Sequence, residues 1–319
     1  MAAKIPQFKL NNGVLMPSVG MGCWMGEPGG GQRVYDMCAN AIRAGYRHFD
    51  TADGYQNEEH VGKAIRDSGV PRKEIFVTTK LNNSDHHRVA EAFERSLKAL
   101  DIEYIDLYLM HWPQATEGTF HGKTLKPEDH PTYQETWAEM TKLLDTGKVR
   151  ALGVSNFGVP LIESLLKTTT VVPAVNQVEL HPCFPRLGLR KLCEKHGIVI
   201  TAYSPIGQPQ PGSVSPLLTD EDVVRIAKKH GATEGQVALS WGVQNGIVVV
   251  PKSENLERMK NNITLLQLDD DDLKAINGIY RKEGKHKSLL NYHNDDGTVF
   301  GWTYEQLGWE LAKGNVGKD

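Results

Sequence analysis

The sequence has few cysteines, and none of them are arranged as a disulfide framework or a zinc site. No two cysteines show CxxC spacing in the 319 residues, and all four lie in apolar segments: Cys23, Cys38, Cys183 and Cys193. Cysteines of this kind in a long chain are more often buried thiols than cross-links or metal ligands. The pair His86 and His87, and His181 near Cys183, also lack four-ligand spacing. We therefore expect reduced, buried thiols and no metal.

The sequence also lacks an excess of charge of one sign and any long apolar run. Lys and Arg number 36 against 39 Asp and Glu, a formal net charge of -3. Such a balance gives no general field for nucleic acid or an anionic membrane. The start, MAAKIPQFKL, has no charged region followed by an apolar stretch, so we expect no signal peptide and no membrane span. These absences favour a cytoplasmic protein that acts on a small molecule. We expect a monomer or a weak dimer.

A glycine-rich phosphate loop and a domain linker are likewise missing. The run Gly29-Gly30-Gly31 has neither GxGxxG nor GxxxxGK[ST] spacing, so we interpret it as a flexible turn into a helix. No stretch rich in Pro, Gly and Ser divides the chain. We expect a single domain over residues 1–319.

What the chain does have is a series of short runs rich in β-branched and aromatic residues, each followed by a residue able to do chemistry. The first strand is expected at 19–22, leading to Trp24. The later runs, each with the residue that ends it, are 46–49 (Asp50), 75–79 (Lys80), 105–110 (His111), 150–154 (Ser155), 174–176 (Gln177), 198–202 (Tyr203) and 247–251 (Lys252).

Helical patterns separate these runs. They cover 33–44, 58–68, 87–100, 133–145, 160–167, 189–196, 220–230 and 233–244, with two more at 256–262 and 270–280. Apolar runs alternating with amphipathic helices predict parallel βα units, and polar residues at so many strand ends predict a closed (β/α)8 TIM barrel of the α/β class. Its chemistry should lie where the strands end.

Several local signals add detail to this barrel. Asn11-Asn12-Gly13 predicts a hairpin over 8–16 that caps the barrel bottom. Thr219 is the expected N-cap of the helix at 220–230, which ends in a basic turn before Gly231. The segment 281–319 is expected to form a C-terminal loop and tail over the barrel mouth. Its first part, Arg281–Lys287, is interpreted as a solvated basic turn.

Asp50, Tyr55, Lys80 and His111 come from three successive strand ends, so the barrel can bring them together. A tyrosine hydroxyl has a pKa near 10 and transfers protons poorly at neutral pH. A lysine ammonium about 4 Å away, at an effective dielectric constant of about 20, would attract the phenolate by about 4 kcal/mol, at most about 3 pKa units. Asp50 can balance the charge of Lys80, and His111 can donate or relay a hydrogen bond. Taken singly, each residue also has an ordinary structural interpretation.

Such a set suits protonation of a carbonyl oxygen while a hydride arrives from a cofactor, because no side chain supplies a hydride. Tyr203 offers a flat face for a nicotinamide ring, and Ser155, Asn156 and Gln177 could bind its carboxamide. The strand end and helix start at 251–258 carry two cations, Lys252 and Arg258, which suit the 2′-phosphate of NADP.

Several motifs resemble the aldo-keto reductase superfamily. They are GYRHFDTADGYQNE at 45–58, LMHWP at 109–113, GVSNF at 153–157, NQVELHP at 176–182 and VPKS at 250–253. The resemblance implies reduction of aldehydes or ketones with NADPH (NADP+), with Tyr55 as general acid, His111 as orienting group, and Asp50 and Lys80 as a tuning pair. It is greatest to the fungal glycerol dehydrogenase and aldose reductase branch, and implies small substrates such as aldoses, glyceraldehyde or aromatic aldehydes. Trp24 and Trp112 would line the substrate pocket beside Tyr55 and His111. We assign to the cofactor site Cys23, Trp24, Ser155, Asn156, Gln177, Tyr203, Ser204, Ile206, Lys252, Ser253, Asn255, Arg258 and Asn262.

Two departures from the family pattern leave alternatives open. Glu254 could bind ribose hydroxyls or repel a 2′-phosphate, so NADH stands as a weaker alternative cofactor. The tail at 285–319 does not follow the mammalian aldose reductase pattern, so that enzyme's substrate range is not carried over. This tail and the loops at 114–131 and 208–216 are expected to shape the pocket. A nucleotide-sensing module, as in potassium channel β subunits, and a structural role, as in some lens crystallins, are the rival functions.

Overall fold

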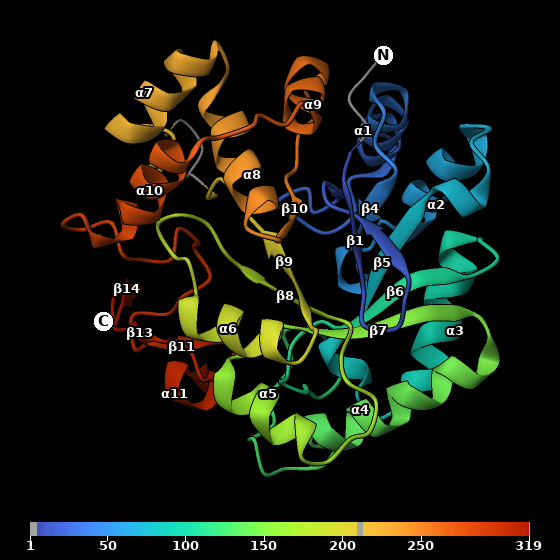
Figure 1. The fold of residues 1–319 in the computed structure, drawn as a ribbon. Coiled ribbons are helices and arrows are strands. Elements are labelled where there is room, and N and C mark those ends of the chain that lie inside the picture. The colour runs from blue at the N-terminus through green and yellow to red at the C-terminus, as the bar shows by residue number, and fades with distance from the viewer. Residues whose placement is uncertain (1–4, 209–212, 319) are drawn as a thin grey trace.

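The protein, described here as a computed structural model over residues 5–208 and 213–318, is built around eight parallel strands. Each strand pairs with its neighbours in chain order, and a parallel bridge between Val19 and Val249 joins the first strand to the last (Figure 1). The sheet is therefore a closed barrel, and the predicted (β/α)8 fold is confirmed. The strands are β3 (Met21–Gly22), β4 (His48–Asp50), β5 (Phe76–Leu81), β6 (Ile105–Met110), β7 (Val149–Ser155), β8 (Val175–Glu179), β9 (Val199–Tyr203) and β10 (Val248–Val250).

Helices surround the barrel, as Figure 1 shows, and their bounds lie close to those predicted. They are α1 (Gly31–Ala44), α2 (Glu58–Asp67), α3 (Val89–Leu100), α4 (Tyr133–Lys142), α5 (Val159–Leu166), α6 (Leu187–Lys195), α7 (Glu221–His230), α8 (Glu234–Gln244), α9 (Leu256–Ile263) and α10 (Asp270–Gly278). Because helices cover its outer face and side chains fill its interior, β5 and β6 are buried along their whole length.

The glycine run leads into α1, as predicted, and its last residue, Gly31, is the first residue of that helix. Gly30 is the N-cap of α1 with φ of 91°, a conformation that favours glycine, and an added Cβ would lie 2.8 Å from the side chain of Val34. At α7 the predicted cap is wrong by one residue. The Asp220 side chain accepts from the Asp222 amide, while Thr219 donates its hydroxyl to the Pro216 carbonyl. The basic last turn and the left-handed Gly231 at the other end are as predicted.

The N-terminal hairpin closes one end of the barrel. β1 (Gln7–Lys9) pairs antiparallel with β2 (Leu15–Pro17), with Phe8 opposite Met16. Leu10 and Met16 pack in a buried cluster with residues from five strands and the loop before β8: Phe76, Leu107, Leu109, Ala151, Ala174, Val175 and Val248. All of these residues except Leu109 lie toward the amino-terminal parts of their strands, so the hairpin seals the bottom, as the sequence predicted.

The C-terminal segment has regular structure that was not predicted. It contains β11 (Thr298–Val299), β12 (Trp302–Thr303), α11 (Tyr304–Leu307), β13 (Leu311–Ala312) and β14 (Val316–Gly317). It lies beside α5 and α6 in Figure 1, and the Trp309 indole donates to the Asn156 carbonyl at 3.1 Å. The tail thus reaches the strand ends on which the chemistry was predicted.

The interpretation of Arg281–Lys287 as a solvated turn is wrong for two of its cations. The Lys282 ammonium lies 2.8 Å from carboxylate oxygens of both Asp220 and Asp222, and Lys285 lies 3.3 Å from Asp220. The acidic residues at the start of α7 attract these lysines, and the contacts tie the start of the tail to that helix.

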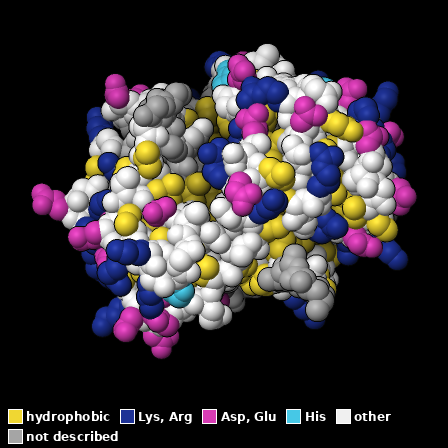
Figure 2. Space-filling model, turned by 90° about the horizontal axis from the view of Figure 1, so that it is seen from above, with side chains coloured by type: hydrophobic (Ala, Val, Ile, Leu, Met, Phe, Trp, Pro, Cys, Tyr) yellow, Lys and Arg dark blue, Asp and Glu magenta, His cyan; other side chains and the backbone are white. Residues whose placement is uncertain are grey.

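Charges of both signs are interspersed over the face that Figure 2 shows, so this face has no broad field of one sign. Within residues 5–208 and 213–318, no helix has the length and apolar character needed to cross a membrane. All four cysteines are free and buried, as predicted.

Candidate active site

The four residues predicted to carry the chemistry meet at the carboxyl ends of β4, β5 and β6. Asp50 ends β4, Lys80 lies one residue before the end of β5, and His111 follows β6. Tyr55 lies on the short 3-10 helix Asp53–Tyr55 that follows β4. Because alternate residues of a strand point to the same side, Asp50 and Lys80 share the barrel interior with His48 and Thr78, which contact each other below them.

Lys80 forms the centre of the group. Its ammonium lies 2.6 Å from Asp50 Oδ1, 2.8 Å from the Thr51 carbonyl and 3.5 Å from the Tyr55 hydroxyl. Lys80 is fully buried and Asp50 is 2% exposed. Desolvation lowers the pKa of Lys80, but Asp50 and Tyr55 outweigh it and raise the pKa above its ordinary value. The ammonium therefore stays charged, as predicted.

The predicted direction of the Tyr55 pKa shift is wrong for this structure. Burial of the hydroxyl raises the pKa of Tyr55, and Lys80 opposes that rise without cancelling it, while Asp50 adds to it. The attraction of Lys80 would by itself lower this pKa, but the desolvation of the buried hydroxyl is the larger effect. The phenol of Tyr55 therefore keeps its proton at neutral pH, and Lys80 can stabilise the phenolate once that proton has left.

His111 faces Tyr55 as a neutral imidazole. The two ring centroids are 5.6 Å apart and nearly perpendicular, at 72°. Desolvation and the charge of Lys80 hold the pKa of His111 well below its usual range. Its Nδ1 is buried and has no hydrogen-bond partner within the described chain. A neutral imidazole is suited to orient a substrate oxygen by a hydrogen bond and is a poor proton donor.

The groups predicted to bind a nicotinamide also converge. The Asn156 side-chain amide donates to the His111 carbonyl at 3.0 Å and accepts from the Tyr203 hydroxyl at 2.7 Å. Ser155 donates to the Gln177 carbonyl at 2.8 Å, and Gln177 donates to Asp50 Oδ2 at 2.6 Å. The same polar network therefore reaches Asp50, the partner of Lys80.

The predicted position of Gln177 at a strand end is wrong. β8 continues to Glu179, which pairs with Tyr203 of β9. Gln177 instead points into the barrel, where it reaches Asp50. This extension puts the buried Glu179 at the strand end, and Glu179 was absent from the predicted site.

The β10–α9 connection holds the cations predicted for the phosphate. Asn255 caps α9 by accepting from the Arg258 amide at 2.9 Å, and Ser253 is buried beneath it, 3.4 Å from Arg258 Nε. Glu254 Oε1 lies 2.6 Å from Lys252 and 3.0 Å from Arg33 of α1. Arg33 and Lys252 lower the pKa of Glu254, so its carboxylate is ionised and held between two cations. No motif in the sequence indicated Arg33, which comes from a helix distant in the chain.

The remaining predicted cofactor residues are spread more widely. The Cys23 thiol lies 3.8 Å from the Cys38 sulfur in the core, and the Cys23 amide donates to the Asp50 carbonyl at 2.9 Å. Ser204 (φ 47°) and the half-buried Ile206 follow β9 in a turn. Asn262 is near the last turn of α9, about 10 Å along the helix from its cap. There its side chain forms a hydrogen bond with Tyr46, and its place around the adenosine phosphate stays a prediction.

Aromatic rings gather around Tyr55 and His111. The ring centroids of Trp24 and Tyr55 are 5.1 Å apart. Trp112 is 4% exposed, and its ring centroid lies 4.8 Å from that of Phe300 and 5.6 Å from that of Tyr292. Phe120 contacts both His111 and Phe300. The loop at 114–131 and the tail thus both contribute rings to this cluster, although Phe120 itself was not singled out; that they shape a substrate pocket stays a prediction. Residues 209–212 of the loop at 208–216 lie outside the described residues.

Comparison with known proteins confirms the family that the motifs indicated. The family model for the Aldo/keto reductase family matches residues 18–281. The chain belongs to this family of oxidoreductases.

Characterised relatives share about two fifths of the sequence. Glycerol 2-dehydrogenase (NADP(+)) of Saccharomyces cerevisiae is 41% identical over 299 residues, 88% of this chain and 92% of that protein. Aldehyde reductase YPR1 of the same yeast is 41% identical over 292 residues, with 87% and 91% covered. The crystal structure of a Bombyx mori aldo-keto reductase in complex with NADP has a TM-score of 0.82 and 35% identity, with 91% of this chain and 96% of that chain covered.

Proposed function

We propose that the protein reduces small aldehydes and ketones to alcohols with NADPH, and that Tyr55 is the general acid. The observation that carries the proposal is the convergence of Tyr55, Lys80, Asp50 and His111 at one end of the barrel. Family membership and the NADP-dependent relatives support carbonyl reduction and NADPH as the cofactor.

The residues present fit a dinucleotide of this kind. Tyr203 presents a ring beside the Asn156 amide, and Lys252, Arg258 and Arg33 gather positive charge near the start of α9. Cations at a helix N-terminus suit a phosphate, and the amide groups suit a carboxamide. When bound, NADPH supplies the hydride that the carbonyl carbon accepts.

This chain's own residues then handle the oxygen and its proton. His111 orients the carbonyl oxygen with a hydrogen bond, and Tyr55 donates its hydroxyl proton to that oxygen. Lys80 stabilises the phenolate that remains, while Asp50 keeps the ammonium charged and in place. Trp24, Trp112, Phe120 and Phe300 exclude water and favour an apolar or aromatic substituent on the substrate.

Within this proposal the substrates are small aldehydes, among them aromatic aldehydes, glyceraldehyde and aldoses. The aromatic wall favours benzaldehyde-type compounds over hydrophilic sugars, since sugar hydroxyls gain little from rings. A cytoplasmic location and a monomeric or weakly dimeric state remain predictions, as does the single-domain organisation.

The test is Tyr55→Phe, which removes the hydroxyl and keeps the ring. We expect kcat for benzaldehyde with NADPH to fall about 10²- to 10⁴-fold, because the proton donor is lost, while the Kd for NADPH changes little. Tyr104→Phe, far from the site, is the control. Near-parental turnover by Tyr55→Phe would reject the role, and NADPH binding without multiple turnovers by the parent would favour a nucleotide sensor.

A further inference from the structure

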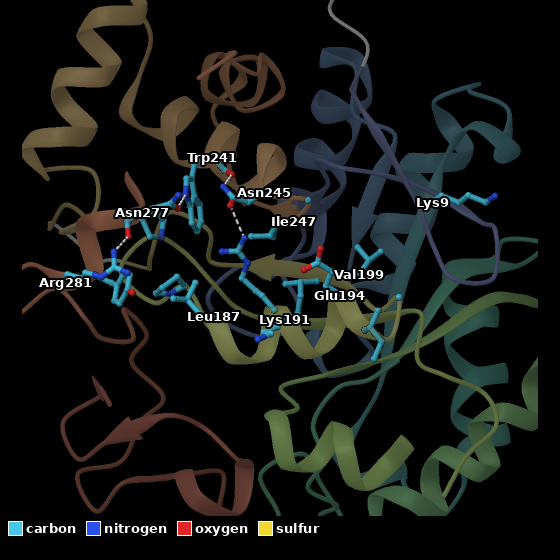
Figure 3. A pocket seen from close by; sticks show the side chains of 18 residues that line it. Lys9, Leu187, Lys191, Glu194, Val199, Trp241, Asn245, Ile247, Asn277 and Arg281 are labelled. Carbon is cyan, nitrogen blue, oxygen red and sulfur yellow. Dashed lines mark hydrogen bonds between the residues drawn. The ribbon is translucent and has the colours of Figure 1, made fainter. Parts of the chain in front are cut away.

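A groove of about 710 Å³ lies outside the barrel, between α6 and α8, and has no part in the proposed chemistry. In Figure 3, Leu187, Lys191 and Glu194 border it from α6, Trp241 and Asn245 from α8, and Asn277 and Arg281 lie at one end. Its floor includes Val199 and Ile247, at the amino-terminal ends of β9 and β10. Tyr203 and Lys252 lie at the opposite ends of these strands, so the groove is separate from the active site.

The groove is basic although the chain as a whole is not. Arg190, Lys191 and Arg281 line it together with one carboxylate, Glu194. Lys9 also contributes to the lining but lies apart from the others in Figure 3. A local excess of positive charge on a chain of formal net charge -3 favours an anionic occupant.

Arg190 is the residue that most needs such an occupant. Its guanidinium donates to Asn245 Oδ1 at 2.9 Å and lies 5.9 Å from the centre of the Trp241 ring. Within residues 5–208 and 213–318, no carboxylate oxygen lies within 4 Å of it, unlike Arg33, Arg72, Arg95 and Arg225. Burial lowers the pKa of Arg190, and Glu194 opposes this from farther away. A partly desolvated guanidinium has five donors, and one amide oxygen does not satisfy them.

Apolar surface adjoins this cation. Leu187 is 49% exposed at the rim, and Pro185 and Tyr280 also line the groove. A leucine left half exposed beside a basic hollow suits a ligand with an apolar part next to its charge.

We propose that the groove binds a small organic anion, with a carboxylate or phosphate paired to Arg190 and an apolar body against Leu187. The anionic head would take the donors that Asn245 leaves available, in the bidentate geometry that a guanidinium prefers. The apolar body would cover Leu187 and the neighbouring proline and tyrosine rings.

The test is isothermal titration of the whole protein with 4-phenylbutyrate, 4-phenylbutyl phosphate and the neutral 4-phenylbutyramide. The two anions should bind at one site and the amide should bind at least about 10-fold more weakly, because a charge-assisted pair is lost. The ratio between the two anions identifies the preferred head group. Failure of both anions to bind would overturn the proposal.

Substitutions in the groove test whether the anion binds there. Arg190→Gln should weaken anion binding about 10-fold or more, whereas Arg225→Gln, a matched loss of charge on α7 outside the groove, should leave it unchanged. Leu187→Glu, at an exposed position that tolerates substitution, puts a carboxylate at the rim and should weaken binding without relying on Arg190. Benzaldehyde reduction by the variants should stay at the parental rate, which reports on folding. Probe affinity that survives both groove variants, with competitive inhibition of benzaldehyde reduction, would assign binding to the active site and overturn the proposal.

Discussion

The hydroxyl of Tyr203, at the end of β9, lies 2.5 Å from the hydroxyl of Tyr292 in the C-terminal tail. Tyr203 donates its proton to Asn156 Oδ1, so Tyr292 is the donor in this pair. Tyr292 also packs against Trp112, with ring centroids 5.6 Å apart. The tail therefore links the proposed nicotinamide platform to the wall of the substrate pocket.

Removing that link should weaken cofactor binding. In Tyr292→Phe the ring contact with Trp112 remains, but the Tyr203 oxygen loses a donor, at a cost of about 1 kcal/mol. We expect the Kd for NADPH, measured by quenching of tryptophan fluorescence, to rise about 5-fold with a smaller change in kcat. Tyr104→Phe is the control, and an unchanged Kd would show that the tail acts on the substrate alone.

The buried pair of Lys80 and Asp50 should dominate stability. Lys80→Met leaves a buried carboxylate without its cation, so we expect the free energy of unfolding to fall by about 3 to 5 kcal/mol. Lys63→Met removes an ion pair with Asp67 whose lysine side chain is 55% exposed, and should cost less than about 1 kcal/mol.

Urea denaturation of both variants measures the difference. The double variant Lys80→Met with Asp50→Asn should recover much of the loss, because it removes the unpaired charge as well. Equal stability of the single and double variants would contradict this account.

His181 should make the free energy of unfolding decrease at alkaline pH. Its side chain is fully buried, and its Nε2 lies 2.9 Å from Glu179 Oε1. Glu179 Oε2 accepts a hydrogen bond from the Ser288 hydroxyl of the tail at 2.6 Å. Desolvation lowers the pKa of His181, but Cys183 and Glu179 outweigh it and raise the pKa to about 9. The folded-state pKa thus exceeds the unfolded value near 6.5, so the stabilisation is complete below about pH 6.5 and is lost as pH rises through about 9.

The loss amounts to about 3 kcal/mol at most. Urea denaturation at pH 6, 8 and 9.5 should show it in the parent and show a flatter profile in His181→Gln. His60→Gln, on the exterior of α2, should keep the parental profile. A parental profile in His181→Gln would indicate that other groups cause the pH dependence.

Glu254 should act as an internal competitor for the cations of the phosphate site. The parent should bind NADPH more tightly than NADH, and Lys252→Ala or Arg258→Ala should remove that preference. Glu254→Gln should release Lys252 and Arg33 and lower the Kd for NADPH about 3- to 10-fold, with a smaller change for NADH.

The matched control is Glu257→Gln, which alters an exposed carboxylate one residue into α9. Fluorescence titration with both nucleotides measures the ratio. Equal affinities of the parent for NADPH and NADH would show that Glu254 already overrides the basic residues.

Most of the barrel could be predicted from the sequence because its signals are local. The apolar runs before Lys80 and His111 are short and bounded, and helices such as α7 carry acidic starts and basic, glycine-terminated ends. The observed strand ends differ from the predicted ones where pairing with a neighbouring strand decides them, as at Glu179, which pairs with Tyr203. A proline at 251 likewise ends β10 one residue before the predicted run ends.

The site was predictable where residues follow strands and not where they arrive from elsewhere. Asp50, Tyr55, Lys80 and His111 come together as expected. Arg33, Phe120 and the bond from Tyr292 to Tyr203 depend on how distant segments pack. The Tyr55 pKa depends on burial, a property of the whole fold, and so its direction was missed.

The hairpin below the barrel has a consequence for turnover. Leu10 and Met16 close the lower end of the barrel, and the buried cluster to which they belong consists of apolar side chains. In the proposed reaction, the proton that Tyr55 donates would therefore be replaced from the carboxyl ends of the strands, where the substrate would bind, so Tyr55 would regain it only after the product has left.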